Sequence, residues 1–459
     1  MRRALLLTAL ALASTAAVVA PAAPAAPAAT WSAPQTVSAP HTFAGPLLTA
    51  TGFDGTLVAG WPWQDDTATD ATGGEAAANH TPGSPFAAEH PAPDGLVGLA
   101  TYGRTRTIAL AQQGIPGRPG PTGAIRYRLN VAYGTLTGGF GKATTLVTAP
   151  VVGQAQLAAD DNGTVLIAWI EVTRTRGGAT RRIVRAIERR GGRFGRPFTL
   201  SGKGRADTLA IAVGPLDAES VVFARQGDVL ARVRRPGHGW GSAQRVARAD
   251  GATQWQLLAR IAGDGEVRLV WRRHQLRRSA VAGRTALEGT AMLVGRGRFL
   301  PAQTILPDGS GAPALVGLGA GGWALATTQA TAGGPRPVLL RARKGSTFGA
   351  PMAAAPAQGG LRGTTLVFVP RTGITVAWIQ PLPGQDSDGV VRAATLAGDP
   401  GFGPVEDVSP PEAAHEVRLA ADPGVDGPAA LWTARPEGTG PSVPIAGIHT
   451  VVRFATRLP

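Results

Sequence analysis

The sequence contains no cysteine. Disulfide crosslinks are therefore excluded, and so is attachment to a membrane through a lipidated cysteine behind a leader peptide. Small exported domains often depend on disulfides for stability. A chain of 459 residues does not, because it is long enough to bury a large hydrophobic core without them.

Lysine is also scarce, with only Lys142, Lys203 and Lys344 beside a large number of arginines. This imbalance is typical of a GC-rich genome. Acidic residues are nevertheless outnumbered, and the formal net charge at pH 7 is +15. A surface of this charge attracts anionic polymers such as wall phosphates, acidic glycans and nucleic acid.

Long apolar runs are absent except at the start of the chain. Met1–Arg3 is a short basic segment, residues 4–20 are apolar, and residues 21–29 are rich in proline and alanine. This order predicts a secretory signal peptide over residues 1–30, cleaved somewhere in 22–30. An uncleaved anchor is the alternative. We therefore expect a secreted, extracellular protein, with cell-wall association as an option, and no membrane span in the mature chain.

Five tryptophans occur in a shared context, in which a turn with glycine is followed by small and β-branched residues and then by Trp. Their spacings are 108, 102, 107 and 54 residues, which are multiples of about 53. Degenerate copies at 107–110, 221–224 and 323–326 fill the gaps, so that eight copies result. The five tryptophans are Trp61, Trp169, Trp271, Trp378 and Trp432.

A second marker recurs in phase with the tryptophans. It is an aromatic residue followed by glycine and often proline, as in Phe194–Pro197 and Phe348–Pro351. Ser84–Phe86 is a poor match in the first copy, and the last copy ends without a marker. The missing piece stands at the other end of the chain, as Trp31–Val37.

Each copy is predicted to form four short strands. In the third copy the first strand includes 156–159, the second carries Trp169, the third includes 183–187, and the fourth follows the aromatic marker. Four-stranded units of this length are typical of β-propeller blades. We expect an all-β propeller of about eight blades over residues 31–459, closed by the N-terminal strand. The alternative is seven blades with 41–93 as a long insertion.

With these strands and markers the chain resembles secreted bacterial β-propellers of the sialidase-like, BNR-repeat type. Asp161–Gly163 and Gly263–Gly265 partly match the Asp-box of that family, although Trp follows Asp161 by eight residues and Asp264 by seven. The resemblance implies a propeller fold and carbohydrate binding. It assigns no catalytic residue here, because the tyrosine nucleophile of sialidases has no identifiable counterpart among the three tyrosines.

Long connections between second and third strands are expected at 64–75, 171–181, 272–284, 329–336, 380–390 and 434–447. In an up-and-down blade these loops all emerge on one face, which we call the long-loop face. Loops on a rigid scaffold commonly carry function. The candidate ligand-binding residues on this face are Trp63, Asp65, Asp66, Arg174, Arg176, His274, Arg277, Arg278, Asp386 and Asp388.

Two functions remain open from the sequence. The first is a non-catalytic binding or scaffold protein whose ligand is a glycan, an anionic wall polymer or another exported protein. The second is a glycoside hydrolase or polysaccharide lyase that uses carboxylates on the same face. No cofactor and no metal site are expected, since the seven histidines are scattered and Asp386–Gly389 lacks the later ligands of a calcium loop. Nucleic acid is an unlikely partner, because aromatic residues do not accompany the basic segments.

Overall fold

The computed structural model describes residues 30–458, with gaps in the chain. The residues within this range that are not described are 42, 45, 53, 67–70, 120–124, 150–151, 175–177, 203, 249–251, 276–283, 294–296, 320, 383–388, 399–400, 413, 423–425 and 436–449. Residues 1–29 of the predicted signal peptide lie outside the described residues.

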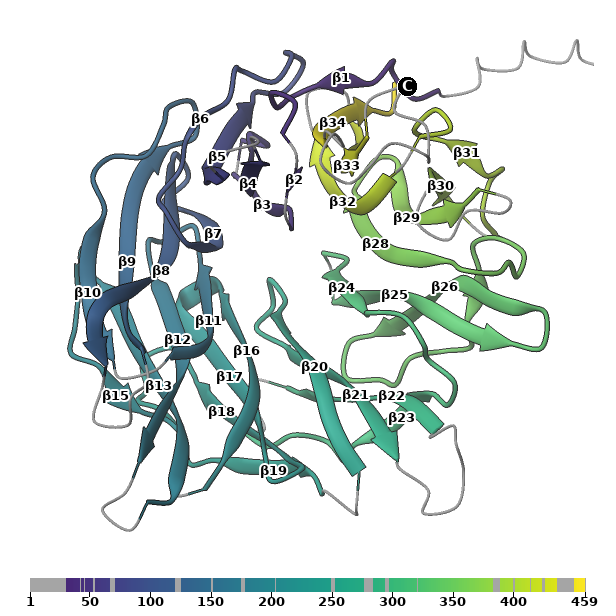
Figure 1. The fold of residues 1–459 in the computed structure, drawn as a ribbon. Helices are drawn as coiled ribbons and strands as arrows, with labels where there is room; N and C mark the ends of the chain where they lie inside the picture. Colours follow the sequence, from purple (N-terminus) through teal and green to yellow (C-terminus); the bar gives the residue numbers. More distant parts are fainter. Residues whose placement is uncertain are drawn as a thin grey trace, which may run out of the picture.

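Eight antiparallel sheets surround a central axis and form a β-propeller (Figure 1). The strands of the first four blades are β2 (Phe43–Ala44), β3 (Leu48–Thr51), β4 (Leu57–Asp66), β5 (Ala71–His80) and β6 (His90–Pro91); β7 (Leu96–Tyr102), β8 (Arg106–Pro119), β9 (Ile125–Thr135) and β10 (Thr144–Ala149); β11 (Val152–Ala159), β12 (Val165–Arg174), β13 (Thr180–Arg190), β14 (Arg193–Phe194) and β15 (Phe198–Thr199); β16 (Ala206–Gly214), β17 (Ala218–Arg225), β18 (Asp228–Arg234) and β19 (Gln244–Ala247).

The other four blades complete the ring. Their strands are β20 (Ala252–Ile261), β21 (Val267–Gln275), β22 (Arg284–Met292) and β23 (Gln303–Leu306); β24 (Ala314–Gly317), β25 (Gly322–Thr331), β26 (Gly334–Arg343) and β27 (Met352–Ala353); β28 (Arg362–Val369), β29 (Gly373–Pro381), β30 (Gly389–Leu396) and β31 (Glu406–Asp407); β32 (Ala414–Asp422), β33 (Gly427–Ala434), β34 (Val451–Thr456) and β1 (Gln35–Thr36). The one described helical turn is η1 (Pro215–Asp217).

The turn between the first two strands of a blade follows from its Asp-Gly or Asn-Gly sequence. The Asp264 carboxylate accepts a hydrogen bond from the Glu266 amide at 3.0 Å, and Gly265 has a φ of +81°. Asp54 and Gly55 form the same turn in the first blade. Glycine adopts positive φ without steric cost, which suits it to tight hairpins.

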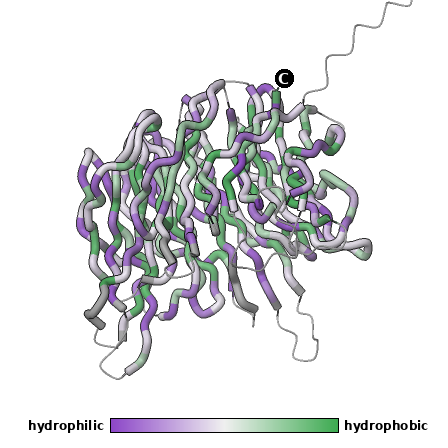
Figure 2. The backbone as a smooth tube through the Cα atoms, turned by 45° about the horizontal axis from the view of Figure 1, so that its top comes forward, coloured by the Kyte–Doolittle hydropathy of each residue, from purple (hydrophilic) through white to green (hydrophobic). Residues whose placement is uncertain are grey.

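The repeated tryptophans form the core between neighbouring blades. All five are completely buried, and Trp323 of the degenerate sixth copy is buried with them. Trp169 packs in one cluster with Ile108 and Leu110 of the second blade and with Val165 of its own. Hydrophobic and hydrophilic residues alternate along many of the strands (Figure 2). Each blade thus buries its apolar positions against the next one.

The ring closes through the N-terminal segment, as predicted. β1 pairs with β34 through Gln35↔Phe454 and Thr36↔Arg453, and Trp31 bridges to Arg457. The last blade therefore takes its outermost strand from the start of the chain. Residues 41–93 form a complete first blade, so that eight blades is the correct number and the seven-blade alternative is wrong.

Two expectations about local structure need correction. Residues 329–336 are not a long loop, because β25 continues to Thr331 and β26 begins at Gly334, which leaves a two-residue turn. Several other expected loops are also shorter than predicted, since the paired strands extend into them, as β4 and β5 do. None of the described residues forms a helix long and apolar enough to cross a membrane.

Candidate functional site: the central channel and its mouth

The innermost strand of every blade is interrupted near its start. In β7, β11, β16, β20, β28 and β32 the pairing register shifts at a β-bulge. In the other two blades the break is longer, between Ala44 and Leu48 and between Gly309 and Ala314. Bulges turn side chains to new directions and are common beside functional sites.

These interruptions lie at the mouth of the channel on the long-loop face. The inner strand of a blade runs antiparallel to the second strand, so its start lies beside the end of the second strand. The second strand ends where the long loop begins. The residues at the six bulges are exposed there. They are Val97, Gln154, Asp207, Gln256, Gly363 and His415.

Several polar side chains at the mouth bridge neighbouring inner strands. The Gln154 side-chain oxygen accepts a hydrogen bond from the Leu209 amide at 2.8 Å, and Gln156 bonds the Leu209 carbonyl at 2.9 Å. Glu416 of β32 accepts from the Leu47 amide at 2.9 Å. Inner strands have an unpaired edge facing the channel, and these side chains satisfy part of it.

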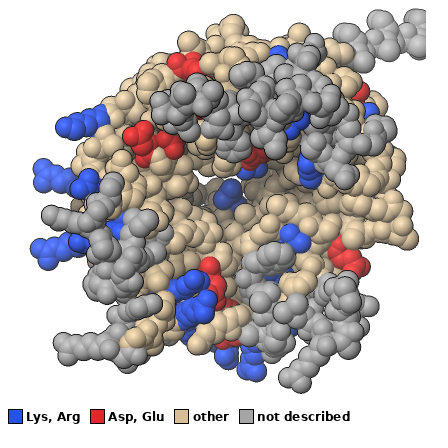
Figure 3. Space-filling view, viewed as in Figure 1, with Lys and Arg blue, Asp and Glu red and all other residues tan. Residues whose placement is uncertain are grey.

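Within the channel, a cavity of about 480 Å³ is lined by the inner strands of the first five blades. Most of the lining residues are apolar, with Leu99, Leu157 and Ile211 among them. Arg260 of β20 is its one charged lining residue among those described. Figure 3 shows the hollow at the centre of the ring, with basic side chains inside it.

Arg260 has no ion pair with any described carboxylate. Its one hydrogen bond to a described residue goes from Nη1 to the carbonyl of Ala259, at 3.1 Å. The side chain is exposed to the channel, and partial desolvation by the surrounding strands lowers the pKa of Arg260. Arginine keeps its proton under all ordinary conditions. Among the described residues, no carboxylate therefore balances this positive charge in the channel.

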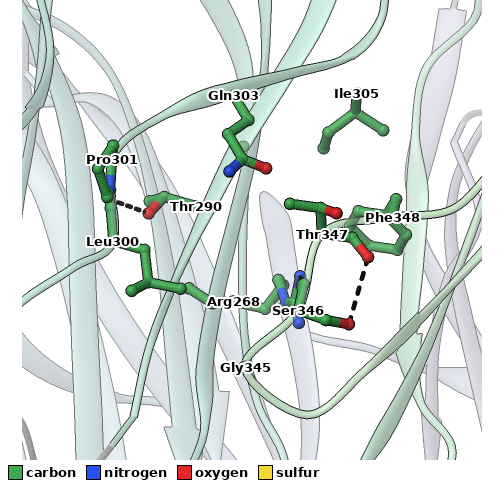
Figure 4. A pocket seen from close by; sticks show the side chains of 12 residues that line it. Arg268, Thr290, Leu300, Pro301, Gln303, Ile305, Gly345, Ser346, Thr347 and Phe348 are labelled. Atoms are coloured by element: carbon green, nitrogen blue, oxygen red, sulfur yellow. Dashed lines mark hydrogen bonds between the residues drawn. The ribbon is translucent and has the colours of Figure 1, made fainter.

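Arg268, on the next strand of the same blade, shows the opposite arrangement. It lies at a pocket of about 310 Å³ between the fifth and sixth blades (Figure 4). Its guanidinium donates to the Glu266 carboxylate at 2.7 Å and to the carbonyl of Ser346 at 2.9 Å. Burial is the largest influence on the pKa of Arg268 and lowers it, while Glu266 raises it. Arg268 is thus neutralised by Glu266 and joins two blades.

Two predicted site residues, Trp63 and Asp65, lie together at the seam between the first and eighth blades. They surround His41, whose imidazole stacks on the Trp63 ring with centroids 4.5 Å apart. Nδ1 of His41 lies 3.2 Å from the Asp65 carboxylate, and Nε2 lies 3.8 Å from that of Glu89. His41 is buried and bridges to Thr450 of the last blade. One face of the Trp63 ring is therefore covered.

The other predicted residues are spread around the ring or lie outside the described residues. His274 is on β21, where Nδ1 lies 3.1 Å from the Thr285 hydroxyl. Asp66 and Arg174 end their strands, β4 and β12, on the long-loop face. Five predicted residues lie outside the described residues, namely Arg176, Arg277, Arg278, Asp386 and Asp388.

Sequence reasoning missed Arg260, His41 and Glu89. Arg260 is one of many arginines, and nothing in its neighbourhood distinguishes it. A usable signal existed in the repeat, since Arg260 stands just before the turn at Asp264 on a strand whose counterparts are apolar there. Among the described residues there is no group of three or more His, Asp or Glu side chains placed to hold a metal ion.

No protein-family model matches the chain, and no curated protein matches it in sequence. Solved structures do share its arrangement. One is an ulvan lyase described as a new polysaccharide lyase family, with 10% identity and a TM-score of 0.49 over 81% of this chain and 96% of the lyase.

Two sialidase structures are also similar. A Trypanosoma rangeli sialidase has 10% identity and a TM-score of 0.38 over 94% of this chain and 60% of the sialidase. An intramolecular trans-sialidase from Ruminococcus gnavus has 8% identity and a TM-score of 0.38 over 91% and 94% of the two chains. Identities this low carry no argument about what this chain binds.

Proposed function

We propose that this protein is an exported, non-catalytic binding module for an anionic glycan or wall polymer, received at the channel mouth on the long-loop face. Residues 1–30 would act as the export signal and be removed. Arg260 is the observation that carries the proposal. A charged group of the ligand would enter the channel and pair with its guanidinium.

The energetics favour an anionic ligand. The Arg260 guanidinium is in contact with channel water and has no described carboxylate beside it. A carboxylate, sulfate or phosphate that pairs with the guanidinium would form charge-assisted hydrogen bonds, and it would meet no competing acidic group among the described lining residues. The cavity of about 480 Å³ is within the range of small-molecule sites, about 300–1,000 Å³, so it accommodates the end of a chain or a side branch.

The overall charge supports the same class of ligand. A formal charge of +15 attracts an anionic polymer over a longer range and concentrates it at the surface. Gln154 and Gln256 at the bulges use their side-chain oxygens within the protein, with Leu209 and Arg272, and their amide nitrogens are donors at the mouth. Long-range attraction and a specific contact in the channel would thus act together.

The test compares Arg260→Gln with Arg245→Gln. Both remove one positive charge, but Arg245 lies on the outer strand β19, where it pairs with Asp228 at 3.6 Å. We expect the Arg260 variant to bind oligogalacturonate at least tenfold more weakly, and the Arg245 variant to bind as the unchanged protein does. Equal affinity of the two variants would overturn the proposal.

Salt dependence provides a second measurement. Affinity of the unchanged protein for the same oligomer should fall between about 0.05 and 0.5 M salt, because screening weakens long-range attraction. Binding of a neutral oligosaccharide, such as maltotetraose, should be much weaker at every salt concentration. Equal binding of the neutral and acidic oligomers would remove the electrostatic basis of the proposal.

A second candidate function, glycan cleavage, is favoured by the arrangement around His41. An imidazole held by Asp65 and close to Glu89 has the groups needed to transfer a proton. The test is release of unsaturated or reducing ends from acidic polysaccharides. Cleavage that is lost in His41→Ala, but kept in His274→Ala, would support this candidate over binding alone.

A further inference from the structure

A second cavity lies on the face opposite the long loops. It has a volume of about 470 Å³ and is lined by the ends of β7, β9 and β13 and the start of β8. Tyr102 and Tyr133 provide its aromatic surface, and Arg106 and Arg189 provide its charge. This cavity is between the second and third blades, away from the central channel.

The two tyrosines and Arg189 form one stacked unit. The tyrosine ring centroids are 6.0 Å apart in an edge-to-face arrangement. The Arg189 guanidinium carbon lies 5.0 Å from the Tyr102 centroid and 5.8 Å from that of Tyr133. Such cation–π contacts fix the direction of the guanidinium. The unit is therefore preorganised before any ligand arrives.

Parts of this unit remain available to a ligand. Tyr133 is 37% exposed, which is unusual for a large aromatic side chain in this protein. Arg189 is 91% buried, its Nη1 donates to the Gly163 carbonyl at 3.0 Å, and its Nε is fully covered. The remaining part of the guanidinium lines the cavity and contributes its positive charge there.

The charge of the lining points in one direction. Arg106 is exposed and forms no ion pair with a described carboxylate. The lining contains no acidic residue, and the rest of it consists of Thr135 and three glycines whose missing side chains leave the cavity open. A guanidinium matches a carboxylate with two parallel hydrogen bonds.

We propose that this cavity is a second glycan-binding site, which takes a carboxylate-bearing sugar of the uronic acid type. The carboxylate pairs with Arg106, a ring oxygen or hydroxyl accepts from Arg189, and the apolar face of the sugar lies on the exposed part of Tyr133. The site shares a ligand class with the proposed function, but it uses none of the same residues. With one site on each face, a single copy of the protein would hold two polymer chains together. One polymer chain that occupies sites on two copies would join those copies.

The experiment uses the full mature chain with Arg260→Gln, so that the channel does not contribute. Calorimetry with a galacturonate tetramer measures the remaining binding. Arg106→Gln should weaken it about tenfold, and Tyr133→Ala about fivefold. Arg245→Gln and Tyr127→Ala are the matched controls, since they remove the same charge and the same ring elsewhere. Neither control should change the affinity.

The possible outcomes separate this site from the channel. Unchanged binding in both Arg106→Gln and Tyr133→Ala overturns the second site, whatever Arg260→Gln does by itself. Loss in these two variants, with Arg260→Gln alone without effect, supports the second site and contradicts the channel. Arg106 is exposed, so its replacement should fold normally, and an unchanged melting temperature confirms that a loss of affinity is local. Equal binding of a neutral tetramer would also overturn the proposal.

Discussion

The imidazole of His80 and the carboxylate of Asp422 form a buried pair, with Nε2 3.0 Å from Oδ2, although 342 positions separate them in the chain. His80 belongs to the first blade and Asp422 to the last. Both side chains are almost fully buried, and Phe86 and Phe454 pack against the imidazole. The pair therefore joins the two blades at which the ring closes.

Replacement of Asp422 by Ala should destabilise the protein strongly. The change leaves His80 buried without its partner, and breaking a buried pair typically costs about 3–5 kcal/mol. Urea denaturation at neutral pH measures the loss. Asp407→Ala is the control, because Asp407 is 62% exposed in its pair with Arg392 and such pairs contribute about 0–1 kcal/mol. Similar losses in the two variants would contradict a closing role for the buried pair.

Trp169→Ala should lower the free energy of unfolding by about 3–5 kcal/mol. The ring is completely buried between the second and third blades, and its removal leaves a cavity that rigid sheets fill poorly. Thermal or urea denaturation tests this value. Trp63→Ala, which removes a partly exposed ring, should cost less. A melting temperature unchanged by Trp169→Ala would argue against the repeat as the source of the core.

Glu219 should make stability depend on pH. Burial and the nearby charge of Glu188 raise the pKa of Glu219 to about 7, although Arg190 and Arg234 oppose this. A raised carboxyl pKa means that the folded protein holds the proton more tightly than the unfolded chain. The resulting stabilisation is complete below about pH 4.5 and is lost as pH rises through 7. The loss should amount to about 3 kcal/mol at most.

Unfolding by urea at pH 5 and pH 8 measures this effect. As pH rises from 5 to 8, the unchanged protein should lose free energy of unfolding relative to Glu219→Gln. Glu188→Gln should shift the midpoint to lower pH, since it removes a negative charge that raises the Glu219 pKa. A constant difference from pH 5 to pH 8 would show that Glu219 stays ionised through this range.

Gly373→Ala should destabilise the seventh blade by more than about 1 kcal/mol. Gly373 begins β29 with a φ of +103°, and a Cβ there would lie 2.2 Å from the Leu396 carbonyl oxygen. Gly398→Ala is the control, since a Cβ at that position meets nothing within 4 Å. Thermal denaturation compares them. Equal melting temperatures would mean that the backbone at β29 adjusts easily.

Much of the fold could be predicted because it is encoded locally. Each blade repeats a turn, a buried Trp and an aromatic marker, and all of these depend on residues close together in the chain. The marker aromatics bridge back to the third strand, as Phe140 does to Gly134 and Trp240 to Arg234. Tryptophan spacing set the number of blades, and Trp31–Val37 indicated the closure.

The candidate site was much less predictable. Asp65 was chosen for its loop, yet its partner His41 comes from the preceding segment and is held by pairing across the blade seam. Long-loop residues such as Asp386 lie outside the described residues, so their role in ligand binding stays a prediction. The repeat marks Arg260 only as a polar residue where the other inner strands are apolar, because its isolation is a property of the channel and not of its neighbours in sequence.

The amino-acid sequence by itself determined the strands, their grouping into eight blades and the closure by the N-terminal segment, because these follow from hydrophobic pattern and turn chemistry over short distances. Only the tertiary structure decided which side chains face the channel. A bulge of one residue reverses the direction of the side chains beside it, and no local pattern specifies where it occurs. Eight inner strands meet only when the ring closes, and Arg260 acquires its solitary position only then.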